Sequence, residues 1–217
     1  MQGAPLFPAI ADIPVPAYYF ELLGTAIFAI TGVLVVVRRG LDMFGALMLG
    51  IVTALGGGTV RDLMIRAPIF WFDDFNYVWA AMLGALLAFW AGSVFRGSYR
   101  ALLYLDALGA ALFAVAAASK VLGMGYGGPI AVMMGILTGI GGGLIRDVLA
   151  GRQTLLMSRE IYATAILLGC TVFVVLRGMT ETFGYAGFAG AAVIFAVRAA
   201  AIRFHLEIPA WLTHSAR

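Results

Sequence analysis

Long apolar stretches, separated by short segments that carry most of the charged residues, follow one another along this 217-residue chain. About 20 mainly apolar residues are needed to cross the hydrocarbon core of a bilayer, so each stretch is predicted to be a membrane-spanning helix. The seven predicted spans cover residues 17–37, 41–65, 75–95, 101–118, 129–150, 161–176 and 183–204. Because the connections are short, the pattern predicts one compact all-α membrane domain over residues 1–217.

The composition places the chain outside the range of soluble domains. Hydrophobic residues make up 63% of the chain, charged residues make up 12%, and the mean hydropathy is +1.00. These values are typical of an integral membrane protein. The single cysteine, Cys170, excludes an internal disulfide framework and a Cys-based metal site within one chain.

The basic residues are scattered at the ends of the apolar stretches, so the net charge of +3 does not indicate a nucleic-acid partner. One side of the predicted bundle is richer in them, with Arg38, Arg39, Arg96, Arg100, Arg152, Arg159 and Arg217 against Arg61, Arg66, Lys120 and Arg177 on the other. The richer side is expected to be cytoplasmic. We therefore predict a multi-pass protein of the cell membrane with its N-terminus outside and its C-terminus inside.

One phrase, Gly-Gly-Gly-x-x-Arg-Asp, occurs at residues 56–62 and again 85 positions later at 141–147. The same offset aligns residues 20–29 with 105–114 and sets one acid, Glu21, against another, Asp106. We interpret this as a duplicated unit of three helices, residues 17–95 and 101–176, followed by a seventh helix at 183–204. An odd number of spans per unit inverts the second copy in the membrane.

The glycine runs are predicted to break the second and fifth helices. Non-helical backbone at membrane depth must face protein or a water-filled cavity, where its carbonyls can coordinate a cation. Close packing of small residues is the alternative. Thr53 and Thr138 precede the runs by three residues, and their hydroxyls could face the ion or bond back to a helix carbonyl. The residues of this predicted pore are Gly56, Gly57, Gly58, Gly141, Gly142, Gly143, Thr53 and Thr138.

Ionisable residues inside a membrane usually face the bundle interior and have a partner. We therefore expect two acid–arginine pairs, Glu21 with Arg61 and Asp106 with Arg146, that line the two mouths of the path. Alternatively, Arg61-Asp62 and Arg146-Asp147 are ordinary interfacial helix ends. Lys120 could enter the path as a movable charge, but snorkelling to the outer surface is preferred.

Three further features are expected at membrane surfaces or helix contacts. Tyr77 is expected in an outer aromatic belt near Trp71. Arg198 is expected to reach the cytoplasmic interface. The small residues around Gly190 suit a close helix contact, within one subunit or between subunits.

The doubled Gly-Gly-Gly-x-x-Arg-Asp motif resembles the signature of the trimeric intracellular cation (TRIC) channel family, and the short chain is similar to its prokaryotic members. The resemblance implies a homotrimer of seven-helix subunits with two inverted three-helix repeats. It also implies an hourglass pore in each subunit, constricted at the glycine bends and permeable to potassium and sodium. Arg61, Asp62, Arg146 and Asp147 would lie beside this pore. Apolar residues precede both glycine runs, so the inositol-lipid binding of animal members is not expected here.

We therefore predict a potassium-permeable, monovalent cation channel with ions in the pore, no assigned ion ligands and no cofactor. Its expected partners are membrane lipids and further copies of itself. A secondary transporter of a small solute such as glycine is the alternative, and a purely structural subunit is a third. No nucleophile or cofactor motif is found, so an enzyme is not expected.

Overall fold

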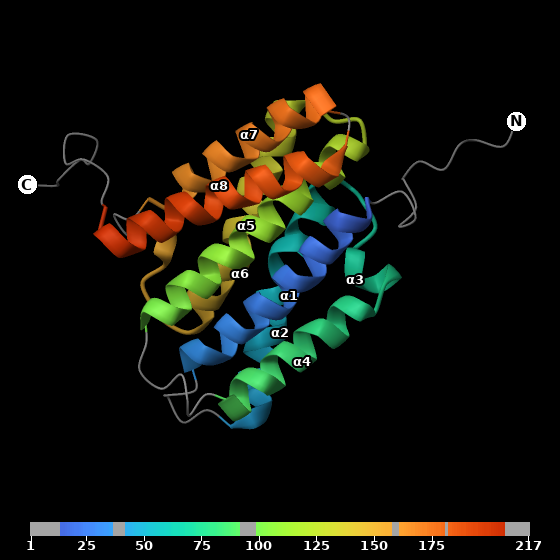
Figure 1. The fold of residues 1–217 in the computed structure, drawn as a ribbon. Coiled ribbons are helices and arrows are strands. Elements are labelled where there is room, and N and C mark those ends of the chain that lie inside the picture. Colours follow the sequence, from blue (N-terminus) through green and yellow to red (C-terminus); the bar gives the residue numbers. More distant parts are fainter. Residues whose placement is uncertain (1–13, 37–41, 92–98, 158–160, 181, 207–217) are drawn as a thin grey trace, which may run out of the picture.

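The computed structural model describes residues 14–36, 42–91, 99–157, 161–180 and 182–206, and these form a bundle of α-helices (Figure 1). A 3-10 turn, Leu155–Met157, follows the sixth helix. The helices are α1 (Val15–Val36), α2 (Met43–Met64), α3 (Phe70–Asp73), α4 (Asn76–Ala91), α5 (Tyr99–Gly123), α6 (Gly128–Leu149), α7 (Ala163–Thr180) and α8 (Phe183–Phe204).

Six of the described helices are long and apolar enough to cross a membrane: α1, α2, α5, α6, α7 and α8. The helix within the predicted third span, α4, has 16 described residues. That span was predicted to extend to residue 95, and its last part lies outside the described residues. The described helices thus confirm an all-α, multi-pass architecture.

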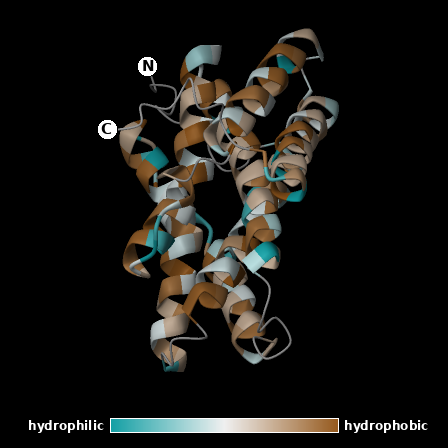
Figure 2. Cartoon of the chain, turned by 90° about the vertical axis from the view of Figure 1, so that its left-hand side faces the viewer, coloured by the Kyte–Doolittle hydropathy of each residue, from teal (hydrophilic) through white to brown (hydrophobic). Residues whose placement is uncertain are grey.

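Alanines and glycines make up much of the bundle interior, while many of the large apolar side chains face outward. Ala107, Ala110 and Ala114 of the central helix α5 are fully buried, whereas Leu87 and Trp90 of α4 are largely exposed. Apolar residues extend along the lengths of the helices (Figure 2). Lipid is as apolar as the bundle interior, so close packing of small residues holds such helices together.

The predicted helix breaks are wrong, because α2 and α6 continue as α-helices through both glycine runs. The runs instead let these two helices touch. A Cβ atom on Gly57 would lie 2.7 Å from the carbonyl oxygen of Thr138, and one on Gly142 would lie 2.5 Å from the carbonyl oxygen of Thr53. Glycine costs a helix about 1 kcal/mol relative to alanine, and the close contact offsets that cost.

Residues that are 85 positions apart make equivalent contacts. Phe28 and Phe113 stack on each other with their ring centroids 5.4 Å apart. A Cβ atom on Gly50 would lie 3.0 Å from the carbonyl oxygen of Ala29, and one on Gly135 would lie 2.9 Å from that of Ala114. The duplication seen in the sequence is therefore also present in the packing.

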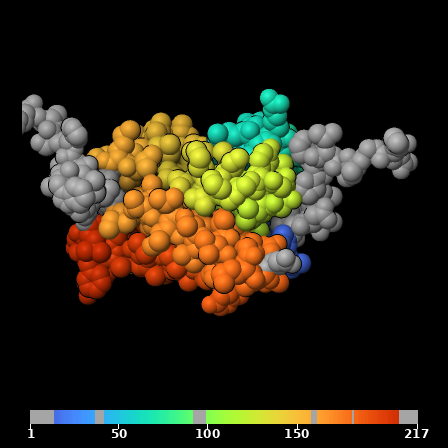
Figure 3. All heavy atoms as spheres, turned by 90° about the horizontal axis from the view of Figure 1, so that it is seen from above, coloured from blue at the N-terminus to red at the C-terminus, as the bar shows by residue number. Residues whose placement is uncertain are grey.

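The last helix, α8, lies beside α7 along one side of the molecule (Figure 3). A Cβ atom on Gly190 of α8 would lie 3.0 Å from the carbonyl oxygen of Gly169 in α7. At Gly190, the small-residue surface thus packs within the protomer.

Candidate functional site

Two buried ion clusters lie where α2 and α6 approach their C-terminal ends. The first cluster consists of Glu21, Arg61 and Asp62. Arg61 donates from Nη1 to Glu21 Oε1 at 2.6 Å and from Nε to Asp62 Oδ1 at 2.8 Å. The Arg61 side chain is fully buried, and the expected Glu21–Arg61 pair is confirmed.

The second cluster consists of Asp106, Arg146 and Asp147. Arg146 donates from Nη1 to Asp106 Oδ1 at 2.7 Å and from Nε to Asp147 Oδ1 at 2.9 Å. Its side chain is also fully buried, and the expected Asp106–Arg146 pair is confirmed. The backbone of the repeat thus places the same charges in the same arrangement twice.

The aspartate of each cluster also fixes the loop that follows its helix. Asp62 Oδ2 accepts a hydrogen bond from the Phe70 backbone N–H at 3.0 Å, and Asp147 Oδ2 accepts one from that of Leu155 at 3.3 Å. A buried ion pair recovers its desolvation cost only when additional hydrogen bonds satisfy its remaining atoms. These loop contacts provide such bonds.

Lys120 of α5 joins the first cluster. Its Nζ donates to Asp62 Oδ1 at 2.8 Å, and its side chain is 13% exposed. The preferred expectation that Lys120 snorkels to the surface is therefore wrong. The ammonium group instead bonds to the buried carboxylate of Asp62, and the contact ties α5 to α2.

Two tyrosines, which sequence reasoning did not assign to the site, lie at the acids. Tyr77 is buried and donates from Oη to Glu21 Oε2 at 3.3 Å, so its expected position in an aromatic belt is wrong. Tyr162 lies 85 residues later and is placed beside Asp106: a Cβ atom on Gly143 would lie 3.1 Å from Asp106 Oδ1 and 3.3 Å from Tyr162 Oη. The offset that aligns Glu21 with Asp106 could have identified this pair.

The two clusters differ in how completely their polar atoms are paired. Within the described residues, both arginines bury an Nη2 atom without a hydrogen-bond partner, Arg61 in the first cluster and Arg146 in the second. The second cluster also buries Asp106 Oδ2 and Tyr162 Oη without a partner in this part of the chain. The two acids differ in length, since the Asp106 side chain is one methylene shorter than that of Glu21. Glu21 Oε2 accepts a hydrogen bond from Tyr77, whereas Asp106 Oδ2 and Tyr162 Oη have no partner among the residues that the structure describes. Arg146 makes an additional bond from Nη1 to Thr31 Oγ1 at 3.0 Å.

Arg198 of α8 lies beside the second cluster and not at the interface where it was expected. The residue is fully buried, its Cζ lies 4.5 Å from the centroid of the Tyr162 ring, and Nη1 donates to the Ile161 carbonyl oxygen at 3.2 Å. A cation on an aromatic face is stabilised by the ring quadrupole. Each cluster therefore has a second positive side chain nearby, Lys120 at the first and Arg198 at the second.

The threonine hydroxyls bond back to their own helices. Thr53 donates to the Leu49 carbonyl oxygen at 2.6 Å and Thr138 to that of Met134 at 2.7 Å. Of the two expectations for these hydroxyls, the back-bond is the one observed. Among the described residues, no group of three His, Cys, Asp or Glu side chains could hold a metal ion.

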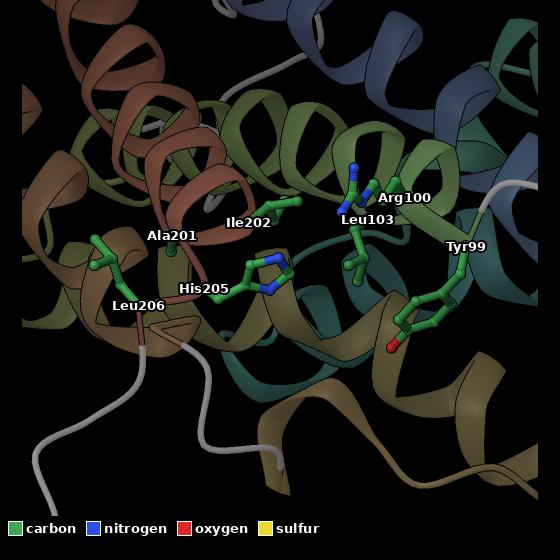
Figure 4. A pocket seen from close by; sticks show the side chains of 7 residues that line it. All are labelled: Tyr99, Arg100, Leu103, Ala201, Ile202, His205 and Leu206. Carbon is green, nitrogen blue, oxygen red and sulfur yellow. The ribbon is translucent and has the colours of Figure 1, made fainter.

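A cavity of about 200 Å³ lies elsewhere, between the first turns of α5 and the last turn of α8 (Figure 4). None of the predicted site residues lines it. Its lining residues are Tyr99, Arg100, Leu103, Ala201, Ile202, His205 and Leu206.

Apolar helices around two duplicated, buried arginine–carboxylate clusters define a multi-pass membrane protein with an internal repeat. A family model described as "Glycine transporter" matches residues 18–93 and again residues 103–178, which lie at the same 85-residue offset. Each half of the chain is thus matched separately.

Relatives match over most of the chain. The chain is 40% identical to the "UPF0126 inner membrane protein YadS" of Escherichia coli K12, over 88% of this chain and 94% of that protein. It is 38% identical to a "UPF0126 membrane protein" of Vibrio cholerae, over 88% and 81%. In sequence the chain is 41% identical to the TRIC trimeric intracellular cation channel orthologue from Rhodobacter sphaeroides. Its structure superposes on the crystal structure of that protein with a TM-score of 0.84, over 88% of this chain and 98% of the orthologue. The chain therefore belongs to the UPF0126 membrane protein family, and it is also similar over most of its length to a solved TRIC channel orthologue.

Proposed function

We propose that this protein is a potassium-permeable, monovalent cation channel of the cell membrane, assembled as a homotrimer with one pore in each subunit. The observation that carries the proposal is the pair of buried, duplicated ion clusters on α2 and α6, in a chain 41% identical to the Rhodobacter sphaeroides channel orthologue. Ionisable side chains at membrane depth are costly and mark ion pathways. Apolar side chains of similar volume could fill the bundle without the cost of burying charges, so packing alone does not explain the two clusters.

The proposed pore has the form of an hourglass. Its narrow part is the crossing of α2 and α6 at Gly57 and Gly142, where the two backbones touch. The clusters lie toward opposite mouths, with Glu21, Arg61, Asp62 and Lys120 outside and Asp106, Arg146 and Asp147 inside. The glycine triplets, Thr53 and Thr138 border the constriction, where potassium or sodium passes.

This arrangement requires two inverted three-helix repeats, residues 17–95 and 101–176, with α4 as the third span and α8 as the seventh. The equivalent contacts of Phe28 with Phe113 and of the paired glycines support such a relation. The N-terminus then lies outside and the C-terminus in the cytoplasm. Since Lys120 ties α5 to α2 in the first cluster, we propose that the pore is closed while this contact holds and opens when it breaks.

A carrier for a small solute such as glycine is the second candidate, favoured by the description of the matching family model. Inverted repeats are also common in secondary transporters. Purified protein in potassium-loaded liposomes separates the two. A channel releases potassium down its gradient, unaffected by added glycine, whereas a carrier takes up labelled glycine with saturable kinetics and releases no potassium. The second result would reject the channel.

A further inference from the structure

We propose that the cavity between α5 and α8 binds the phosphodiester headgroup of an anionic phospholipid (Figure 4). No residue of the ion clusters lines this site, which begins about one helical turn from Asp106 on α5 and from Arg198 on α8. The proposal is independent of whether the protein is a channel or a carrier, but it rests on the proposed topology, in which the end of α8 lies in the cytoplasm.

The cavity is polar at its rim and apolar at its walls. Arg100, His205 and the Tyr99 hydroxyl provide the polar groups. Leu103 and Ile202 are buried walls, and the His205 side chain extends from the end of α8 toward α5. At about 200 Å³, the cavity has room for several water molecules, each of which occupies about 30 Å³ in the liquid. The headgroup of a lipid can therefore enter the cavity while the first carbons of the lipid's acyl chains contact the apolar walls.

The charge around the cavity favours an anion. Among the described residues that line the cavity, none is acidic. Arg152 extends the basic surface, because its Cζ lies 5.3 Å from the centroid of the Tyr99 ring, and Arg203, which follows the lining residue Ile202, is exposed. Guanidinium groups bind phosphate through two parallel hydrogen bonds, which makes Arg100 the expected main contact.

The position in the bundle favours a lipid over a soluble phosphate. α5 is a 25-residue helix long enough to span the hydrocarbon core, so its first turn lies at the bilayer surface. Basic pockets between spanning helices on the cytoplasmic side are typical sites for anionic headgroups. The cavity combines that location with an apolar wall, and a free phosphate ion would leave this wall unused.

The corresponding end of the first repeat lacks this chemistry. The residues 85 positions before Tyr99, Arg100 and Leu103 are Pro14, Val15 and Tyr18. Tyr18 donates to Asp74 Oδ2 at 2.8 Å. The first repeat thus has an acid at this end, whereas the cavity in the second has the bases Arg100 and His205. The cavity is therefore not a part of the duplicated scaffold, and we infer that it serves a separate purpose as a lipid contact.

Binding of detergent-dispersed phosphatidylglycerol and phosphatidylcholine to the purified protein, followed by native mass spectrometry, tests the site. We expect phosphatidylglycerol to bind more tightly. Arg100→Gln should weaken its binding about fivefold, since one basic group near an anionic lipid contributes about that factor. Arg100→Lys should retain most of the affinity. Arg177→Gln, which removes one positive charge from the last turn of α7, is the matched control and should change little.

Three results would overturn the proposal. The first is equal binding of the two lipids to the unaltered protein, a comparison that needs no variant to fold. The second is an equal loss of phosphatidylglycerol binding in the Arg100→Gln and Arg177→Gln variants. The third is full displacement of the lipid by inorganic phosphate at low millimolar concentration, which would assign the cavity to a soluble phosphate.

Discussion

The first and second ion clusters share one backbone plan, yet their acids are held differently. Glu21 accepts hydrogen bonds on both carboxylate oxygens, from Arg61 and Tyr77. Asp106 accepts on one oxygen, from Arg146, while its other oxygen and the nearby Tyr162 hydroxyl have no partner within the described residues. Duplication thus determines where the charges lie, and single substitutions between the repeats determine how tightly they are held.

The cations added to each cluster show the same division. Lys120 has Val35 as its counterpart in the first repeat, so the tie from α5 to α2 exists once. The second cluster instead receives Arg198 from α8, a helix outside the duplicated unit, across the face of Tyr162. A symmetric scaffold therefore carries two clusters of different chemistry. The first includes an ion pair between α5 and α2, and the second has buried polar atoms without a hydrogen-bond partner among the described residues.

The largest expected effect is on stability, from breaking the first cluster. Arg61→Glu leaves Glu21 and Asp62 buried without their cation and should lower the free energy of unfolding by about 3–5 kcal/mol. Glu21→Arg in the same chain should restore part of the loss, because the pair is present with its charges exchanged. Unfolding in mixed micelles measures both, and Arg66→Glu, which changes an arginine outside the cluster, is the control. A double variant no more stable than either single variant would contradict the pairing.

Next in size is the effect of filling the contact between α2 and α6. Gly57→Ala and Gly142→Ala each place a Cβ atom within 2.7 Å of a carbonyl oxygen of the facing helix and should destabilise the protein by about 1–3 kcal/mol. Potassium flux should fall as well, because the crossing is the proposed constriction. Gly178→Ala is the matched control, since nothing lies within 4 Å of its new Cβ. Loss of assembly with flux per folded protein unchanged would instead favour a purely structural role for the crossing.

The tie between α5 and α2 should have a similar effect on stability and a clear one on gating. Lys120→Gln removes a hydrogen bond between charged groups, which contributes about 1.5–3 kcal/mol. If that bond exists mainly in the closed pore, open probability should rise at least about tenfold. Single-channel recording checks this, with Lys120→Arg expected to restore closure. Unchanged open probability and conductance in Lys120→Gln would exclude Lys120 from the gate.

The smallest expected effect compares the tyrosines directly. Tyr77→Phe removes a hydrogen bond to Glu21 and should cost about 1 kcal/mol of stability. Tyr162→Phe removes a hydroxyl without a hydrogen bond, keeps the ring below Arg198, and should not destabilise the protein. Equal losses in the two variants would show that the clusters are equally paired, contrary to their geometry.

The features that the sequence predicted correctly depend on the repeat. The 85-residue offset aligned Glu21 with Asp106 and Arg61 with Arg146, and an acid and an arginine at membrane depth need each other. The offset also aligns Tyr77 with Tyr162, but the neighbouring Trp71 and Phe72 favoured an aromatic belt at the membrane surface for Tyr77.

The errors arose where contacts between distant helices outweigh local propensity. Three glycines weaken a helix without unwinding it, and whether α2 breaks depends on Thr138 in α6, which the local sequence does not show. Lys120 was expected at the surface because its partner, Asp62, lies 58 residues away on another helix. Arg198 was expected at the interface because α8 lies outside the duplicated unit, so the 85-residue offset does not show that Arg198 contacts Tyr162.

A single-channel recording of the purified protein in a planar bilayer, with unequal potassium chloride on the two sides, tests the central claim most directly. If the two clusters border a cation path, discrete openings will reverse near the potassium equilibrium potential. Openings that reverse near the chloride potential would contradict the account. So would a silent bilayer formed with protein that is folded and takes up glycine in liposomes.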